Sequence, residues 1–238
     1  MNKENLGKEE KVPKSIGIIM DGNRRWAKGK GLPAMAGHLA GYKKVKEVVK
    51  WVENSQVKYL TLYTFSIENW KRETKEVNYL MKIIFSLYKK EIKNFLKNNI
   101  RVKVIGDKTL LSPETFTALE KIEKETGDCT GLTLVLAISY GGRQEIIGAI
   151  KKLSQEKTKE EIVKITEKDF ENYLWTKGNL DPDLIIRTSG EMRLSNFLPW
   201  QSAYSELFFT KTFWPDFSEK EFKNILEEFT KRQRRYGK

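Results

Sequence analysis

Apolar positions along the chain alternate between short continuous runs and longer segments where they recur every three or four residues. The continuous runs, rich in β-branched and aromatic side chains, predict six strands at residues 16–20, 59–65, 102–105, 132–138, 184–187 and 207–209. The helical spacing predicts helices from 37 to about 52, over roughly 74–98, from 113 to about 126, over 144–153 and from 218 to about 234. Short helices are expected within 155–168 and at 169–174.

Strands that alternate with helices indicate an α/β fold. We expect a single domain with a mostly parallel, six-stranded central sheet flanked by helices. Residues 1–14 are polar and predict a flexible N-terminal tail, which leaves residues 15–238 for the folded domain. No apolar run approaches the ~18 residues of a membrane span, and the tail lacks the apolar core of a signal peptide. We therefore expect a cytoplasmic protein.

The charged residues and the scarcity of Cys and His narrow the function. The chain has 44 Lys and Arg against 32 Asp and Glu, a formal charge of +12, with one Cys and one His. One Cys excludes an internal disulfide, and one Cys with one His excludes a Cys/His zinc site. The basic excess predicts an anionic partner, which could be nucleic acid, an anionic lipid surface or a phosphorylated small molecule.

Polar side chains gather where predicted strands end, which is where open α/β sheets bind ligands. The first strand is followed by Asp21-Gly22-Asn23-Arg24-Arg25-Trp26, and the fifth by Thr188 to Ser195. Arginines offer forked donors to phosphate oxygens, and a carboxylate suits Mg²⁺. We expect two anion cradles and two acidic candidates, Asp21 and Glu206, at one edge of the sheet. Such cradles predict two phosphorylated ligands, or one large one.

Each segment taken alone also fits an ordinary structural explanation. The first is equally a tight turn with solvated charges. The polar loop Ser66-Ile67-Glu68-Asn69-Trp70, taken alone, is better explained as a loop capped by a packed Trp. His38 suits a packed or capping side chain as well as a phosphate donor. No phosphate-binding P-loop or dinucleotide-binding glycine motif is present, which argues against ATP and NAD.

Several long segments together resemble the cis-prenyltransferases, the undecaprenyl diphosphate synthase family. They are Ile18 to Ala27 (IIMDGNRRWA), Phe65 to Arg72 (FSIENWKR), Asp183 to Phe197 (DLIIRTSGEMRLSNF), and the residues around Trp200-Gln201, Glu206-Leu207 and Trp214-Pro215. The resemblance runs from about Ile16 to the C-terminus, in order. Within it, Ala34 stands where the family usually has an arginine that helps to bind diphosphate.

The resemblance implies a catalytic domain over 15–238 and a Mg²⁺-dependent transferase. It would condense isopentenyl diphosphate onto an allylic diphosphate, usually farnesyl diphosphate, with cis double bonds, giving a polyprenyl diphosphate such as undecaprenyl diphosphate, a cell wall lipid carrier. It also implies a homodimer and a hydrophobic tunnel for the growing chain. Because such a product is strongly apolar, we also expect the protein to make a peripheral contact with the inner face of the membrane.

The resemblance also assigns roles to individual residues. Asp21 and Asn69 are the catalytic candidates, and Asp21 and Glu206 the metal ligands. The allylic diphosphate would lie against Gly22, Asn23, Arg24, Arg25, Trp26 and His38. Ser66, Ile67, Glu68, Trp70 and Arg72 would shape the reacting centre. Arg187, Arg193, Leu194 and Ser195 would bind isopentenyl diphosphate.

Three alternatives remain beside this reading. A divergent copy of the family would make a shorter polyprenyl diphosphate. A module that binds RNA or an anionic surface would use the basic excess, but no aromatic RNA-binding signature is present. A non-catalytic regulator would not need the intact Asp21, Asn23, Arg187, Arg193 and Glu206. We expect no nucleic-acid partner.

Overall fold

The computed structural model describes residues 12–232, except for the side chains of residues 87–89. Most of the predicted tail, and the C-terminal end of the last predicted helix, lie outside the described residues. Among the described residues, no helix is both long enough and apolar enough to cross a membrane.

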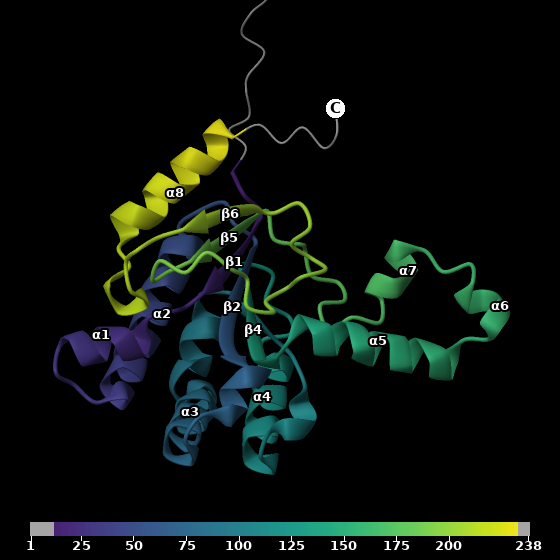
Figure 1. Cartoon of the computed structure of the whole chain (residues 1–238), viewed down its shortest axis with the longest axis horizontal. Coiled ribbons are helices and arrows are strands. Elements are labelled where there is room, and N and C mark those ends of the chain that lie inside the picture. The colour runs from purple at the N-terminus through teal and green to yellow at the C-terminus, as the bar shows by residue number, and fades with distance from the viewer. Residues whose placement is uncertain (1–11, 233–238) are drawn as a thin grey trace, which may run out of the picture.

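Six strands form one sheet at the centre of the molecule (Figure 1). They are β1 (Ser15–Ile19), β2 (Tyr59–Ser66), β3 (Arg101–Ile105), β4 (Thr133–Tyr140), β5 (Leu184–Arg187) and β6 (Glu206–Phe209). The strand order is β3-β4-β2-β1-β5-β6, and all five neighbouring pairs are parallel. The predicted α/β class is confirmed, and the sheet is wholly parallel.

Helices cover the sheet and extend beyond it. The longer ones are α2 (Ala34–Glu53), α3 (Thr74–Lys97), α4 (Pro113–Glu125), α5 (Gly142–Glu156) and α8 (Glu219–Lys231). The shorter ones are α1 (Asn23–Gly29), α6 (Lys159–Ile162) and α7 (Glu167–Glu171), with 3-10 turns η1 (Ile67–Lys71), η2 (Lys108–Leu110) and η3 (Trp214–Asp216). In Figure 1 the α5–α7 segment projects away from the sheet like an arm.

Both faces of the central strands are buried, which explains their almost continuous apolar sequences. All five residues of β1 and all eight of β4 are buried. The larger core cluster includes Ile16, Ile18 and residues of α2, α3, α4 and α8, and a smaller one on the other face is built around Tyr140 and Phe197. This burial fixes the sheet, and hence the polar segments that follow its strands.

Helix α1 was not expected from the sequence, which predicted a loop there. It has only seven residues and no side-chain cap. It packs against α2 because Gly37 and Gly41 leave room for Asn23: a Cβ on Gly37 would lie 2.0 Å from the Asn23 carbonyl oxygen. These two glycines, one helical turn apart, bring α1 and α2 together beside the end of β1.

Candidate active site

Asp21 lies just beyond β1, in a turn that only glycine can complete. Gly22 has φ +105°, and a Cβ on it would come within 2.7 Å of Phe213 and 2.9 Å of Ser189. The hydroxyl of Thr188, which follows the neighbouring strand β5, accepts from the Asp21 amide at 2.9 Å and donates to its carbonyl at 2.7 Å. The ends of β1 and β5 are thus joined directly, as the sequence predicted.

Two arginines hold the Asp21 carboxylate. Arg187, with only 4% of its side chain exposed, lies 2.9 Å from Oδ2, and the half-exposed Arg25 lies 3.2 Å from Oδ1. Burial raises the pKa of Asp21. The hydrogen bond and the charge of Arg187, together with Arg25 and Ser189, lower it by a larger amount, so the pKa of Asp21 is below its usual value. The carboxylate is therefore ionised at neutral pH.

The loop after β5 has an unusual backbone. Ser189, Ser195, Asn196 and Leu198 all have φ between +48° and +78°, a region that L-residues rarely adopt. Arg187 fastens this loop by donating to the Arg193 carbonyl and, at 2.8 Å, to the Ser195 hydroxyl. Backbone strain of this kind clusters at functional sites, where surrounding contacts hold it in place.

Charges at the rim of the loop are paired with one another. Glu191 accepts from Arg25 at 2.9 Å and from Arg193. Arg25 also donates to the Ser189 hydroxyl at 2.7 Å. Arg25 therefore connects the segment after β1 with the loop after β5. Leu194 packs under this loop against the smaller core cluster.

The segment after β2 forms the third wall. It is a 3-10 turn capped in both directions by Ser66 and Asn69, whose Oδ1 accepts from the Ser66 amide at 3.1 Å. Trp70 donates to the Ser139 hydroxyl at 3.1 Å, so it anchors the turn on the sheet. Glu68 accepts from Asn196, which ties this turn, including Ile67, to the loop after β5.

His38 is buried against α3 and belongs to a charged network. Its Nε2–H donates to Glu76 at 2.9 Å, and Arg72 donates to the same oxygen at 2.9 Å. Arg24 lies 3.8 Å from the other oxygen of Glu76. Burial lowers the pKa of His38 and the two arginines add to this, against the opposing effect of Glu76. A neutral His38 at pH 7 fits its role as a single-proton donor here.

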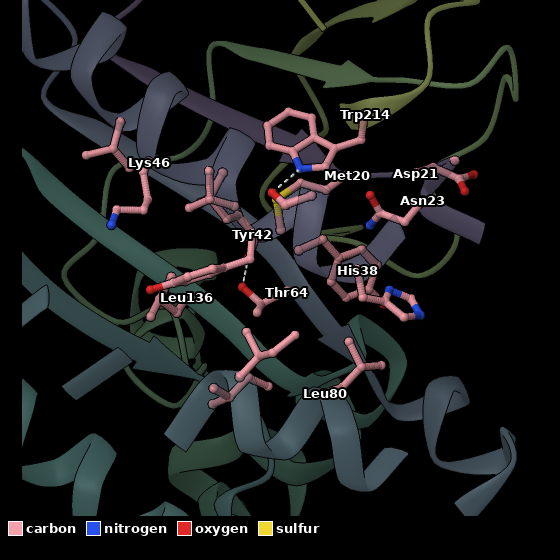
Figure 2. Close-up of a pocket in the computed structure, with 18 of the residues that line it drawn as sticks. Met20, Asp21, Asn23, His38, Tyr42, Lys46, Thr64, Leu80, Leu136 and Trp214 are labelled. Carbon is pink, nitrogen blue, oxygen red and sulfur yellow. Dashed lines mark hydrogen bonds between the residues drawn. The ribbon is translucent and has the colours of Figure 1, made fainter. Parts of the chain in front are cut away.

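Some of these groups line the mouth of a large cavity of about 1260 Å³ between α2, α3 and the sheet. Other predicted site residues are not part of its lining: Ser66, Ile67, Glu68, Trp70, Arg187, Arg193, Leu194 and Ser195. Figure 2 shows Asp21, Asn23 and His38 toward one end of it and Lys46 toward the other. The predicted site residues that line it are Asp21, Gly22, Asn23, Arg24, Arg25, His38, Asn69 and Arg72. Its deeper wall includes Leu62, Leu80, Ile84 and Leu136. The cavity thus joins a cationic mouth to an interior with large apolar walls, which Lys46 and Glu91 also line.

Glu206 lies elsewhere, so the expectation that it shares an edge with Asp21 is wrong. It opens β6 and aligns with Leu184 at the start of β5, whereas Asp21 follows the opposite ends of the strands. Its carboxylate pairs with Arg232 at 2.8 Å. The error arose because residues that open a parallel strand face the other edge of the sheet. Trp26 is not part of the cavity lining either, and its indole N–H donates to Asp216 at 2.8 Å.

Asp21 fits a magnesium ion, but only together with a ligand. Within residues 12–232, no group of three or more acidic, His or Cys side chains is placed to hold a metal. Mg²⁺ commonly takes one or two carboxylates and completes its shell with water and phosphate oxygens. A single ionised carboxylate beside a cationic mouth matches this requirement.

Several residues of the site were not predicted from the sequence. Thr188 and Asn196 join the loops, while Glu76 organises the basic groups. Glu76 lies in the first turn of the predicted helix, but Arg72 precedes that helix, so helical spacing did not predict the pair. Tyr42 and Glu91, which meet across the cavity, are 49 residues apart and left no local signal.

Comparison with known proteins places this chain in a family. A family model described as "Putative undecaprenyl diphosphate synthase" matches residues 19–237. The chain is 48% identical to isoprenyl transferases of Clostridium perfringens and Bacillus subtilis, covering 96% and 99% of this chain and 91% of each relative.

Solved structures with a similar fold support the same family. The fold matches lavandulyl diphosphate synthase from Lavandula x intermedia in complex with dimethylallyl diphosphate, with a TM-score of 0.90 and 32% identity, covering 95% of this chain and 99% of that one. It matches a probable undecaprenyl diphosphate synthase from Campylobacter jejuni with a TM-score of 0.79 and 33% identity, at the same coverage. With its parallel sheet, cationic mouth and apolar cavity, the chain belongs to the undecaprenyl diphosphate synthase family and is an isoprenyl transferase.

Proposed function

We propose that this enzyme condenses isopentenyl diphosphate onto an allylic diphosphate, with farnesyl diphosphate as the starter, and forms cis double bonds to give a long polyprenyl diphosphate. The observation that carries the proposal is the cavity of about 1260 Å³ whose mouth holds Asp21 with Arg24, Arg25 and Arg72, and whose interior has large apolar walls. An anionic head and a hydrocarbon tail need these two environments side by side.

The roles of the residues follow from what each can do to a diphosphate. In the reaction, the allylic C–O bond breaks and diphosphate leaves with the electron pair, while the double bond of isopentenyl diphosphate attacks the allylic carbon and a proton is lost. Arg24 and Arg25 at the mouth, with the backbone at Gly22, stabilise the leaving charge. Arg187, Arg193 and Ser195 hold the second diphosphate beside the first, which supplies proximity.

The proton must pass to a group at the reacting centre. Asn69 lines the cavity, but a neutral amide is a weak base. We propose that Asn69 orients the acceptor and that the departing diphosphate or Asp21 takes the proton. Asp21 would also hold Mg²⁺, which supplies charge neutralisation of the leaving group when bound.

The arm and the charged surface suggest two further partners. Ile147, Ile150 and Val163 on the arm are 53%, 48% and 86% exposed, which suits burial against a second copy of the chain as a homodimer. Glu206, remote from Asp21 within one chain, would reach a metal only across such an interface.

Near α1, exposed Leu32 and Leu39 beside basic residues suit a peripheral contact with an anionic membrane.

One experiment tests the main proposal. The protein is incubated with labelled isopentenyl diphosphate, Mg²⁺ and geranyl or farnesyl diphosphate in turn, and the products are sized. We expect elongation that Asp21→Asn lowers by at least a hundredfold, whereas Asp128→Asn on the exposed surface leaves it unchanged. Failure of the wild-type protein to elongate any starter would contradict the proposal.

The proton-transfer role needs its own variant pair. Asn69→Ala is expected to lower turnover, and Asn78→Ala, an exposed position on α3, serves as its control. Full turnover by Asn69→Ala would remove Asn69 from the mechanism.

A further inference from the structure

Asn196 caps helix α5 from a distant part of the chain. Helix α5 begins at Gly142 and has no side-chain cap of its own. The Gly142 amide donates to the Asn196 carbonyl oxygen at 2.8 Å, and the Arg143 amide donates to Asn196 Oδ1 at 2.8 Å. The first N–H groups of a helix have no partner within the helix. Asn196 supplies two of these partners, although it follows Arg143 by 53 residues.

The other end of the same side chain reaches the turn after β2. Asn196 Nδ2 donates to Glu68 Oε1 and to Gln144 Oε1, each at 3.0 Å. A side-chain amide has one acceptor oxygen and two N–H groups, so these bonds and the bond from Arg143 form together. Only the oxygen can accept from the Arg143 amide, which fixes the orientation of the side chain. The segments that follow β2, β4 and β5 therefore meet at Asn196.

The turn at Asn196 has a backbone that needs support. Ser195 has φ +48° and Asn196 has φ +68°, the left-handed region that asparagine adopts more readily than most residues. Before the turn, Arg187 donates to the Ser195 hydroxyl at 2.8 Å, and after it Phe197 is fully buried in the smaller core cluster. The Tyr63 hydroxyl adds a longer bond to the Ser195 carbonyl oxygen, at 3.3 Å. Between these anchors, Asn196 supplies the shorter hydrogen bonds that fix the turn.

The neighbours of Asn196 connect it to both halves of the proposed site. Ser195 directly precedes it and is one of the groups proposed to hold isopentenyl diphosphate. Glu68 directly precedes Asn69, which lines the cavity. The hydrogen bond between Asn196 and Glu68 thus ties the loop of the second diphosphate to the turn at the reacting centre. Because the side-chain oxygen and both N–H groups of Asn196 are used within the protein, it acts on the substrate through these neighbours.

We propose that Asn196 is a positioning residue for isopentenyl diphosphate. This inference rests on the proposed function, which assigns Arg187, Arg193 and Ser195 to that substrate, and it adds the residue that sets their loop. Without the Asn196 side chain, part of the binding free energy is used to order the loop, so the affinity falls. The effect is selective, because the arginines proposed for the allylic diphosphate lie on α1, outside this loop.

The main test compares two asparagines that share an unusual backbone. Asn196→Gly removes three side-chain hydrogen bonds, and glycine adopts the same φ without strain. At saturating farnesyl diphosphate and Mg²⁺, we expect the KM for isopentenyl diphosphate to rise about tenfold, and the KM for farnesyl diphosphate to change by less than about twofold. Asn99→Gly is the matched control: Asn99 has φ +55°, bonds Thr130 through both ends of its side chain and lies at the opposite edge of the sheet. We expect both KM values of this control to be unchanged.

Gly141→Ala provides a second perturbation that leaves Asn196 in place. A Cβ on Gly141 would lie 2.8 Å from Asn196 Nδ2 and 2.4 Å from Gln144 Oε1, so it displaces the end of the Asn196 side chain. We expect the KM for isopentenyl diphosphate to rise about threefold. Gly148→Ala, on α5 and with open space around the added Cβ, is its control. This pair gives a result even if Asn196→Gly does not fold.

The outcomes separate this inference from the proposed function. If wild-type protein elongates but Asn196→Gly and Gly141→Ala leave the KM for isopentenyl diphosphate unchanged, or raise both KM values equally, the positioning role is overturned and the proposed function stands. If Asn196→Ala raises that KM and Asn196→Gly does not, backbone strain is responsible and the role of the side chain is overturned.

Calorimetric titration with isopentenyl diphosphate and Mg²⁺ gives a result that does not depend on turnover. If wild-type protein elongates no starter, the proposed function is overturned, and the titration then decides the role of Asn196. Binding to Asn196→Gly that is weaker by about fivefold or more supports the role. Equal binding, or no binding to wild-type protein, overturns it.

Discussion

Replacing Arg187 with methionine keeps most of the length of the side chain but removes the guanidinium that holds Asp21. The two groups lie 2.9 Å apart, and the arginine side chain is 4% exposed. A hydrogen bond to a charged group contributes roughly 1.5–3 kcal/mol to stability. Arg25 also lies close to Asp21, at 3.2 Å, but is 44% exposed. Exposed pairs contribute about 0.2–1 kcal/mol.

A double-mutant cycle measures this difference directly. The free energy of unfolding in urea is compared for wild type, Arg187→Met, Asp21→Ala and the double variant, and a matched cycle uses Arg25→Met. We expect a coupling of about 1.5–3 kcal/mol for Arg187 and about 0.2–1 kcal/mol for Arg25. Equal couplings, or a larger one for Arg25, would refute the conclusion that burial makes Arg187 the main partner.

The pH dependence gives a second check on the same pair. The pKa of Asp21 is lowered in the folded state from its usual 3.8, so its contribution is complete above that value. It is lost as the pH falls further, through the folded-state pKa. The coupling with Arg187 is therefore expected to stay constant from neutral pH down to about 4 and then to shrink. A coupling that stays unchanged well below pH 3.8 would contradict the charge-based account.

Three further changes test other parts of the site and its support. Ala34→Arg restores a diphosphate donor and is expected to lower the KM for one substrate roughly tenfold in steady-state assays; unchanged kinetics would mean that another basic group already serves. Gly41→Ala places a Cβ 2.4 Å from Asn23 Oδ1 and is expected to cost about 1–3 kcal/mol in urea unfolding, whereas Gly148→Ala, with open space, is neutral or stabilising. Glu145→Gln replaces one of two buried acceptor oxygens by an NH2 donor, which would face either the Thr176 amide or Tyr140 and Gln201, and should cost about 1–3 kcal/mol; an unchanged melting temperature would contradict its structural role.

Much of the fold was predictable because burial leaves a local record in the sequence. Runs such as 16–20 and 132–138 are apolar because both faces of β1 and β4 are covered. Helix α1 was not, because no capping side chain or apolar period marks seven residues that are held by contacts with α2. The sequence carries the glycines at 37 and 41, but not the information that Asn23 lies against them.

The site was predictable where its residues directly follow strands. Asp21 and Arg187 could be placed together because the carboxyl ends of parallel strands share an edge. That rule does not cover Glu206, because Glu206 opens its strand and so lies at the opposite edge of the sheet. The contact between Tyr42 and Glu91 depends on how two long helices tilt across the sheet, and local spacing does not encode that tilt.

The position of β1 between β2 and β5 has a consequence for synthesis of the chain. Strand β2 ends at Ser66 and β5 ends at Arg187, 121 residues later. At a synthesis rate of about 5–20 residues per second, roughly 6–24 s pass between the completion of β2 and the completion of β5, the second neighbour of β1. Until β5 is made, the edge of β1 that pairs with it has unpaired backbone N–H and C=O groups, and exposed strand edges of this kind favour aggregation. Asp21, made early, gains its arginine partner only near the end, so the enzyme cannot act before it is nearly complete.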